Sequence, residues 1–259
     1  MGESFLRSGP LMALESYPQW AQELVLDSAA ARRAVSEHVF YQHMRDGQLS
    51  AASLRPYLIG GWPVVEQFPL YMAQNLLKTR FGRSPGEDMA RRWLMRNIRV
   101  ELNHADQWLE WAEAYGIGLD DLHAQAVPAE LQALGHWCWQ SCARDDLALA
   151  MAATNYAIEG ATGEWSALVC SGDAYQASLP VEQRKSAMRW LRSHAQYDDE
   201  HPWQALEIIC TLCGSQIEPQ RWRALREAIG TSYAYMQLFL DRCLALEQAA
   251  SRRRAQAPV

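Results

Sequence analysis

The residues best suited to chemistry lie in one segment, Trp190-Leu-Arg-Ser-His194-Ala-Gln-Tyr-Asp198-Asp-Glu-His201-Pro202-Trp203. We interpret it as helix, because no turn signal interrupts its apolar periodicity before Pro202. At about 100° per residue, Asp198 would lie about 40° to one side of His194 and His201 about 20° to the other. Two imidazoles and a carboxylate on one stripe suit iron, manganese or zinc. A solvated polar face is the alternative, but most flanking positions are aromatic or aliphatic.

Other segments contain residues that could complete such a site. Glu101 and His104 are i and i+3, about 60° apart on one face of an expected helix. This Glu-x-x-His spacing occurs in the carboxylate-bridged di-iron sites of helical bundles. Glu159 and Glu66 each lie among small and apolar residues, where a carboxylate must be ion-paired or metal-bound. A buried ion pair with an arginine is the alternative for both.

Together these residues predict a two-metal site of asymmetric type. The second Glu-x-x-His of a symmetric site is missing, because Thr162 stands where its histidine would be. Oxygen and nitrogen ligands with open positions are what non-haem iron uses to bind O₂, so we expect oxidative chemistry. Zinc hydrolysis competes, although it seldom requires so many carboxylates. The candidate metal ligands are Glu66, Glu101, His104, Glu159, His194, Asp198 and His201.

The composition excludes several classes of protein. The 259 residues carry a net charge of −6 with no clustered basic surface, which argues against nucleic-acid binding. No apolar run approaches the roughly 18 residues of a membrane span and no signal peptide is evident, so we expect a cytoplasmic protein. The six cysteines are expected to be reduced thiols. Cys210-x-x-Cys213 could be a redox or zinc pair, but two core cysteines on one helical face are favoured.

The chain predicts a single all-α domain of seven or eight helices over residues 1–259, with flexible ends at 1–10 and 251–259. Almost nothing alternates as a strand would. Gly60, Gly61 and Pro63 should bend or interrupt the third helix. The expected helices run approximately over 11–25, 28–46, 50–80, 85–115, 128–143, 145–174, 180–214 and 219–250.

Two segments resemble a known group of proteins. The stretch Phe40-Tyr-Gln-His-Met-Arg-Asp-Gly-Gln-Leu-Ser50 and the stretch Tyr197-Asp-Asp-Glu-His-Pro-Trp-Gln-Ala-Leu-Glu207 are similar to the TenA and PqqC group, which has the haem-oxygenase-like helical fold. Within it, the expected ligands resemble those of the haem-oxygenase-like di-iron oxidases. The nearest resemblance is to the UndA family, bacterial medium-chain fatty-acid decarboxylases that form terminal alkenes such as 1-undecene.

This resemblance implies a cofactor and a reaction. It implies Fe(II), with two ions of which the second is loosely held, and O₂ and an external reductant as co-substrates. Lauric acid would lose a β-hydrogen and CO₂ to give 1-undecene, with Glu101, His104 and His194 as the catalytic residues. The electron donor and the oligomeric state stay open, a homodimer being one option. The candidate walls of the substrate pocket are Tyr156, Trp190, Tyr235, Leu238 and Phe239.

Four other functions were weighed. A related oxidase could act on a different carboxylate or on an amino acid, by desaturation, hydroxylation or C–C cleavage. A PqqC-like cofactor-free oxidase would leave the carboxylates unexplained. A thiaminase of the TenA type needs a nucleophilic cysteine, and none occurs between Asp145 and Leu168. A non-enzymatic binder of haem or a metabolite is the fourth.

Overall fold

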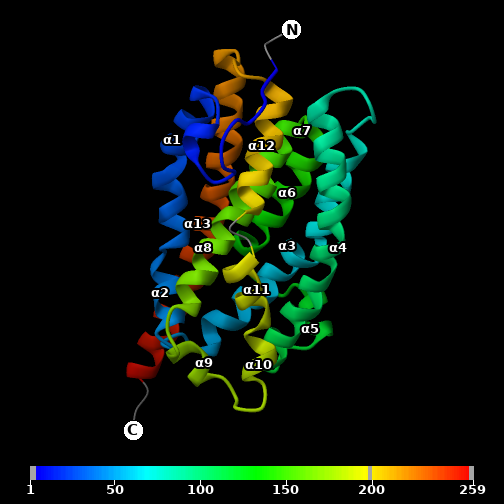
Figure 1. Ribbon diagram of the computed structural model, residues 1–259. Coiled ribbons are helices and arrows are strands. Elements are labelled where there is room, and N and C mark those ends of the chain that lie inside the picture. The colour runs from blue at the N-terminus through cyan, green and yellow to red at the C-terminus, as the bar shows by residue number, and fades with distance from the viewer. Residues whose placement is uncertain (1–3, 198–199, 257–259) are drawn as a thin grey trace.

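A computed structural model describes residues 4–197 and 200–256, and every regular element in these ranges is a helix (Figure 1). No helix there is long and apolar enough to cross a bilayer. The all-α prediction is therefore confirmed, with more and shorter helices than expected. In chain order they are η1(Leu14–Ser16), α1(Gln19–Ser36), α2(Val39–Arg45), α3(Ala51–Leu77), α4(Pro85–Glu113), α5(Leu119–Ala124), η2(Ala129–Leu131), α6(Ala133–Arg144), α7(Leu147–Met151), η3(Ala152–Ile158), α8(Glu159–Cys170), α9(Ala174–Ser178), α10(Arg184–Ala187), α11(Arg189–Tyr197), α12(His201–Cys213) and α13(Pro219–Gln256).

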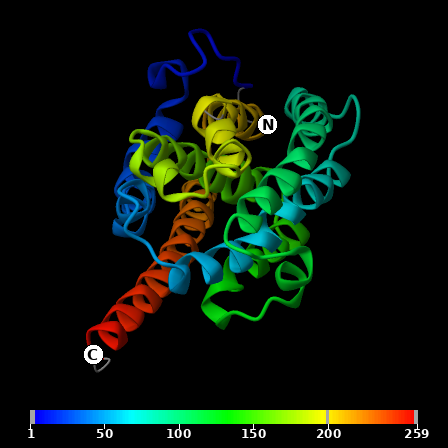
Figure 2. The same ribbon diagram turned by 90° about the horizontal axis from the view of Figure 1, so that it is seen from below.

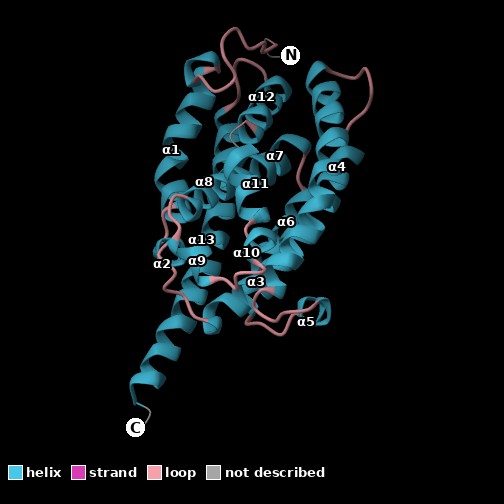
Figure 3. Cartoon of the chain, turned by 60° about the horizontal axis from the view of Figure 1, so that its bottom comes forward, coloured by secondary structure: helices cyan, strands magenta, loops and turns pink. Residues whose placement is uncertain are grey.

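The long helices form an elongated bundle around one apolar core. α3 packs against α4, α1 against α13, and α11 against α8. Seen from below, α13 crosses the bundle diagonally and its last turns project beyond it (Figure 2). The view coloured by secondary structure shows only helices and the loops between them in the described residues (Figure 3). This arrangement brings α4, α8, α11 and α12 together in the middle of the molecule.

Several helix ends follow from local sequence. The Ser84 hydroxyl accepts a hydrogen bond from the Glu87 amide and Pro85 occupies the first turn, so α4 begins where the sequence predicts. α13 likewise begins at Pro219. α3 continues through Pro56, Pro63 and Pro69. The third helix is therefore not interrupted, and the alternative expectation of a bend stays a prediction.

The predicted boundary near residue 28 is wrong. α1 runs through Ser28, whose hydroxyl bonds back to the Val25 carbonyl instead of capping a new helix. The break lies at residues 37–38, where the ring of His38 accepts a hydrogen bond from the Phe40 amide and caps α2. A histidine cap is not among the usual N-cap residues, which explains why the sequence signal was missed.

The single helix expected over 180–214 is also wrong, because α10, α11 and α12 replace it. α11 ends at Tyr197 and α12 begins at His201, with Pro202 in its first turn. Proline has no amide hydrogen and disfavours helical geometry in the residue before it, so it is tolerated best at a helix start. His194 and His201 therefore lie on two different helices.

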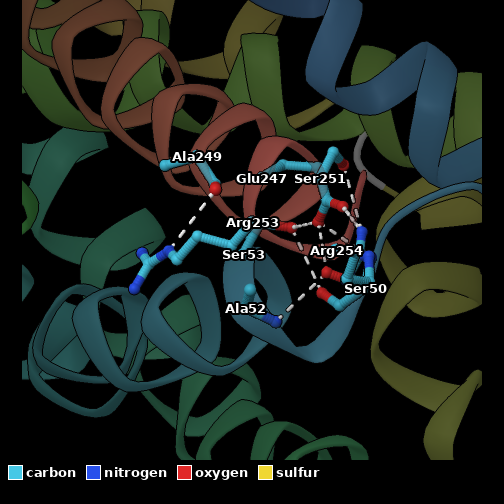
Figure 4. Close-up of polar contacts among 8 residues, drawn as sticks. All are labelled: Ser50, Ala52, Ser53, Glu247, Ala249, Ser251, Arg253 and Arg254. Carbon is cyan, nitrogen blue, oxygen red and sulfur yellow. Dashed lines mark hydrogen bonds and ion pairs between the residues drawn. The ribbon is translucent and has the colours of Figure 1, made fainter. Parts of the chain in front are cut away.

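One buried carboxylate, that of Glu247, connects the C-terminal part of α13 to the N-terminus of α3 (Figure 4). Glu247 of α13 accepts hydrogen bonds through Oε2 from the Ser50 amide at 2.9 Å, and from the Ser50 and Ser53 hydroxyls at 2.7 Å each. Arg254 donates to Oε1 at 3.2 Å. Burial raises the pKa of Glu247, but these hydrogen bonds outweigh it and the pKa lies below its ordinary value. Glu247 thus stabilises the N-terminus of α3.

We expect Glu247→Ala to lower the free energy of unfolding by about 1–2 kcal/mol at neutral pH, because the first turn of α3 loses its acceptor. Since the folded-state pKa is depressed, this contribution is present above the unfolded pKa and is lost as pH falls through the folded pKa. Urea unfolding at several pH values measures it. Glu227→Ala, at an exposed position of the same helix, is the control. A constant difference between wild type and Glu247→Ala down to strongly acidic pH would contradict this account.

Candidate metal centre

Four helices bring five of the candidate ligands into one buried region. α4 contributes Glu101 and His104, α8 contributes Glu159, α11 contributes His194 and α12 contributes His201. The ring centroids of His104 and His194 are 4.4 Å apart. The first four side chains are buried and His201 is half-buried. Paired catalytic metal ions sit roughly 4 Å apart, so their ligands must lie within about 10 Å of each other, as the imidazoles of His104 and His194 do.

Hydrogen bonds fix the orientation of two of the imidazoles. Nδ1 of His104 lies 2.7 Å from Oε2 of Glu101. Nδ1 of His194 lies 2.8 Å from the Trp190 carbonyl oxygen, and the His194 ring stacks on Trp190 at 3.8 Å. A neutral imidazole that donates from Nδ1 carries its lone pair on Nε2. Metal-binding histidines are usually held in this way.

Glu159 begins α8, directly after the π-helical segment η3. Short π-helical stretches often occur at functional sites because they change the direction in which a side chain points. Its Oε1 accepts a hydrogen bond from Asn155 at 2.6 Å, and its Oε2 lies 3.7 Å from Nδ1 of His201. An arginine is the alternative partner for Glu159, but Arg32, which reaches α8, pairs with Glu164 at 2.7 Å.

The electrostatics of the region keep two histidines neutral. Burial, reinforced by the nearby His104, holds the pKa of His194 well below its ordinary value. Burial also lowers the pKa of His201, against the opposing effect of Glu101. A neutral imidazole is the form that binds a metal ion.

Of the other two predicted ligands, Glu66 is not among the residues that line the cavity beside the histidines. Glu66 is half-buried on α3, where Val64, Val65 and Phe68 contribute the side chains that face the histidines. Asp198 lies outside the described residues, so its role stays a prediction.

Two small cavities meet beside these residues, and they share Val64, Val65, Ile158, Thr162 and Trp190. The first, of about 50 Å³, contains the polar groups and is lined by Val64, Val65, Phe68, Glu101, His104, Ile158, Glu159, Thr162, Trp190 and His194. The second, of about 70 Å³, is apolar and is lined by Tyr41, Tyr57, Gly61, Val64, Val65, Trp108, Leu134, Ile158, Thr162, Trp165, Trp190, Met236, Phe239 and Leu240.

Of the predicted pocket walls, Trp190 and Phe239 line the apolar cavity. Tyr156 instead faces Ser28 and Arg32 of α1. Tyr235 stacks on Trp137 at 5.9 Å, and Leu238 is 41% exposed.

For α13, the prediction chose the wrong face of the helix as the pocket wall. Its inner stripe contains Met236, Phe239 and Leu240, which the sequence analysis missed apart from Phe239. An apolar i, i+3, i+4 pattern starting at Tyr235 fits the helix equally well. The choice between the two stripes depends on the packing of α13.

The donor set fits a first-row metal ion, since it combines imidazole nitrogens with carboxylate oxygens. Within residues 4–197 and 200–256, no three His, Cys, Asp or Glu side chains already form a group that could hold an ion. The reason is visible in the contacts, because Glu101 is turned onto His104 and Glu159 onto Asn155. Metal binding would exchange these hydrogen bonds for coordination.

Comparison with known proteins identifies the family of this chain. A family model described as an iron-containing redox enzyme, of the haem-oxygenase-like type, matches residues 55–234. The chain belongs to this family. It is also 62% identical to a TenA homolog from Pseudomonas syringae pv. tomato str. DC3000, whose crystal structure it matches with a TM-score of 0.92 over 94% of this chain and 100% of that one.

More distant structures share the haem-oxygenase-like fold of this family. A domain of unknown function from Shewanella denitrificans OS217, described as having a heme oxygenase-like fold, is 15% identical, with a TM-score of 0.69 over 88% of this chain and 94% of that one. A putative TenA-like thiaminase from Sulfolobus solfataricus P2 is 16% identical, with a TM-score of 0.61 over 87% and 96%. No curated protein matches the chain.

The cysteines take no part in the site. All six are free thiols, as expected, and none is among the residues that line either cavity. Cys210 and Cys213 lie on α12, where burial raises the pKa of both thiols. A buried thiol with a raised pKa rarely forms the thiolate that redox chemistry and zinc binding require. This favours the interpretation of Cys210 and Cys213 as core residues.

We expect His194→Gln to weaken Fe(II) binding at least about 100-fold, because even residues that only orient a ligand contribute 10- to 100-fold to metal affinity. Far-UV circular dichroism should stay unchanged. Iron titration under anaerobic conditions measures the affinity, with His136→Gln, at an exposed position on α6, as the control. Glu101→Gln provides a second variant of the site. Wild-type iron stoichiometry in both site variants would show that the ligands are wrongly assigned.

We also expect Fe(II) to slow hydrogen exchange at the end of α11 and the start of α12, over residues 194–197 and 201–206. The reason is that proposed ligands stand on both sides of the break between these helices. Exchange monitored by mass spectrometry with and without Fe(II) tests this, and peptides from α6 serve as an internal reference. Equal protection in the two states would leave only a static break imposed by Pro202.

Proposed function

We propose that this protein is a non-haem iron oxidase that uses O₂ to oxidise an aliphatic carboxylate, with a medium-chain fatty acid as the substrate. The observation that carries the proposal is a polar cavity and an apolar cavity that lie side by side and share five lining residues. A ligand spanning both would have a polar head among imidazoles and carboxylates and a hydrocarbon tail among aromatic and aliphatic side chains. A fatty acid has this form.

The charges around the polar cavity explain why a metal is needed. Its lining includes two carboxylates, Glu101 and Glu159, and no lysine or arginine. A substrate carboxylate placed there would be repelled unless a bound cation compensates the charge. Glu101, His104, Glu159, His194 and His201 would hold Fe(II), with a second, more loosely held ion as the resemblance implies. Bound iron would supply O₂ activation and hydrogen abstraction from the substrate.

The chain's own residues position the substrate and keep the site dry. Trp190 lines both cavities, so its indole lies where the head and the tail of the substrate would meet. Thr162 also lines both and offers a hydroxyl at that point. Phe239, Met236 and Leu240 line the apolar cavity from α13. The apolar lining excludes water, which protects a reactive oxidant from side reactions.

The cavities are narrow in this structure. Each is smaller than the roughly 150 Å³ apolar cavity that accommodates benzene in an engineered protein. A hydrocarbon tail would therefore require the walls to move. Met236 is suited to this, because its unbranched side chain adapts its shape easily.

The proposed reaction of a fatty acid balances as follows. The acid, O₂, two electrons and two protons give a terminal alkene, CO₂ and two molecules of water. The substrate provides the β-hydrogen, the carboxyl proton and two electrons. Because O₂ accepts four electrons in all, an external reductant must supply the other two.

A second candidate is a related oxidase that acts on another carboxylate or on an amino acid. The family match supports this broader reading better than it supports decarboxylation, since it describes an iron-containing redox enzyme without a substrate. The apolar lining of the second cavity favours a hydrocarbon tail over a polar amino acid. Thiaminase chemistry lacks its nucleophile, because no cysteine lines either cavity.

We expect iron-loaded protein incubated with lauric acid, O₂ and ascorbate to release 1-undecene and CO₂. Headspace gas chromatography measures the alkene, and an oxygen electrode measures O₂ uptake. Glu101→Gln should abolish product, while His136→Gln should keep wild-type yield. Stimulated O₂ uptake with a hydroxylated or desaturated acid as product would replace decarboxylation by the broader reading. Iron-loaded protein that consumes no O₂ with any medium-chain acid would refute the proposed substrate.

A further inference from the structure

A continuous row of tryptophan and tyrosine rings leads from the candidate metal centre to the protein surface. It starts at His194, which stacks on Trp190 with ring centroids 3.8 Å apart. Trp190 stacks on Trp111 at 5.8 Å with 26° between the planes. The centroids of Trp111 and Tyr175 are 6.3 Å apart. The row ends at Tyr115, which is half-buried.

Hydrogen bonds join the outer half of this row. Nε1 of Trp111 donates to the Tyr175 hydroxyl at 2.6 Å, and the Tyr115 hydroxyl donates to the same oxygen at 3.1 Å. Tyr115 follows the end of α4 and Tyr175 belongs to α9, at the lower end of the bundle (Figure 1). The row therefore runs from the middle of the molecule to the end opposite the N-terminus.

Two features distinguish this row from ordinary aromatic packing. Every member beyond His194 is tryptophan or tyrosine, the two aromatic side chains that can be oxidised by one electron, and none is phenylalanine. In addition, Nε1 of Trp190 is buried and has no hydrogen-bond partner among the described residues. An oxidised Trp190 would have no acceptor for its proton, so it would stay a strongly oxidising cation and take an electron from Trp111.

A second row of rings, which leads from Trp190 through Trp165, ends at buried tyrosines. Trp190 also stacks on Trp165 at 5.3 Å, and Trp165 lies parallel to Tyr41 at 4.4 Å. Tyr41 and its neighbour Tyr57 are both 3% exposed. Only the branch through Trp111 and Tyr175 reaches a ring with access to solvent among these contacts.

We propose that Trp190, Trp111, Tyr175 and Tyr115 form an electron relay between the oxidised iron of the centre and a one-electron reductant in solution, of the ascorbate class. This inference rests on the proposed function, because it needs an iron site that reacts with O₂. One electron leaves the reductant at Tyr115, and one electron arrives at the oxidised iron through Trp190. Each ring is oxidised and re-reduced in turn. The phenolic proton of Tyr115 leaves for solvent on oxidation and returns on reduction.

The relay would deliver the external electrons that the proposed reaction requires. Decarboxylation requires two electrons from outside, while the centre is buried and its cavities are too narrow for a reductant to enter. When no substrate is bound, the same route would carry oxidising equivalents away from the ligands and so protect His194.

The test is to trap the radical on Tyr115. Fe(II)-loaded protein without substrate or reductant is exposed to O₂ with a nitrone spin trap, and catalase removes diffusible peroxide. Tandem mass spectrometry then locates and quantifies the adduct, while iron content and O₂ uptake are measured on the same samples. The buried Tyr41 and Tyr57 are shielded from the trap, so the adduct reports the outer end of the relay.

We expect an adduct on Tyr115 in the wild type and a several-fold smaller yield in Tyr175→Phe, which removes a single hydroxyl. Trp111→Phe should have the same effect and should shift oxygen addition to Trp190 and His194. Trp137→Phe is the matched control, because Trp137 also donates its indole hydrogen to a hydroxyl, that of Ser232, but lies outside the row.

Three results would overturn the relay. Equal adduct yields in all variants would show that Tyr115 is oxidised directly from solution. O₂ uptake without any adduct on Tyr115 would refute the relay alone and leave the iron oxidase standing. Protein that binds no iron or consumes no O₂ would refute the proposed function, and the relay with it.

Discussion

The structure depends on burying carboxylates and imidazoles together in the middle of an aromatic helical bundle. Burying an isolated charge costs more free energy than the net stability of a folded domain. Glu101 is stabilised by His104, and Glu159 by Asn155 and by its proximity to His201. These contacts make the region tolerable without a metal ion and leave ligand atoms that an ion could use. In the candidate centre, each carboxylate therefore contacts a neighbouring side chain, and binding of a metal ion would replace these contacts.

The helices around this group are interrupted where the donors are. The π-helical segment η3 ends immediately before Glu159, and the break between α11 and α12 separates His194 from His201. An uninterrupted helix would fix all its side chains on one regular surface. The two irregularities instead let donors from several directions face one cavity. The proposed site would use this irregular helix geometry, and the surrounding packed helices compensate its cost.

Membership of the family of iron-containing redox enzymes and the geometry of the cavities support each other. The family's description gives a class of enzyme, and the two adjacent cavities are the basis for the proposed form of the ligand. Neither names the substrate. The distinction matters, because the 62% identical protein from Pseudomonas syringae is described only as a TenA homolog. The apolar cavity lined by Phe239, Met236 and Leu240 is the part of this chain that favours a fatty acid within that class.

The sequence alone determined the fold class and most of the centre. Periodicity and capping signals identified α4 and α13, and the spacing of Glu101 and His104 predicted a candidate ligand pair on one helix face, because both depend on residues close together along the chain. The tertiary structure decided which stripe of α13 faces inward, where the helix around Pro202 breaks, and that Glu66 is not among the residues lining either cavity. It also decided that Trp190 meets Trp111 and Tyr175, from segments far apart in sequence. Such choices depend on how helices rotate and pack against one another, and a periodic pattern leaves that rotation undetermined.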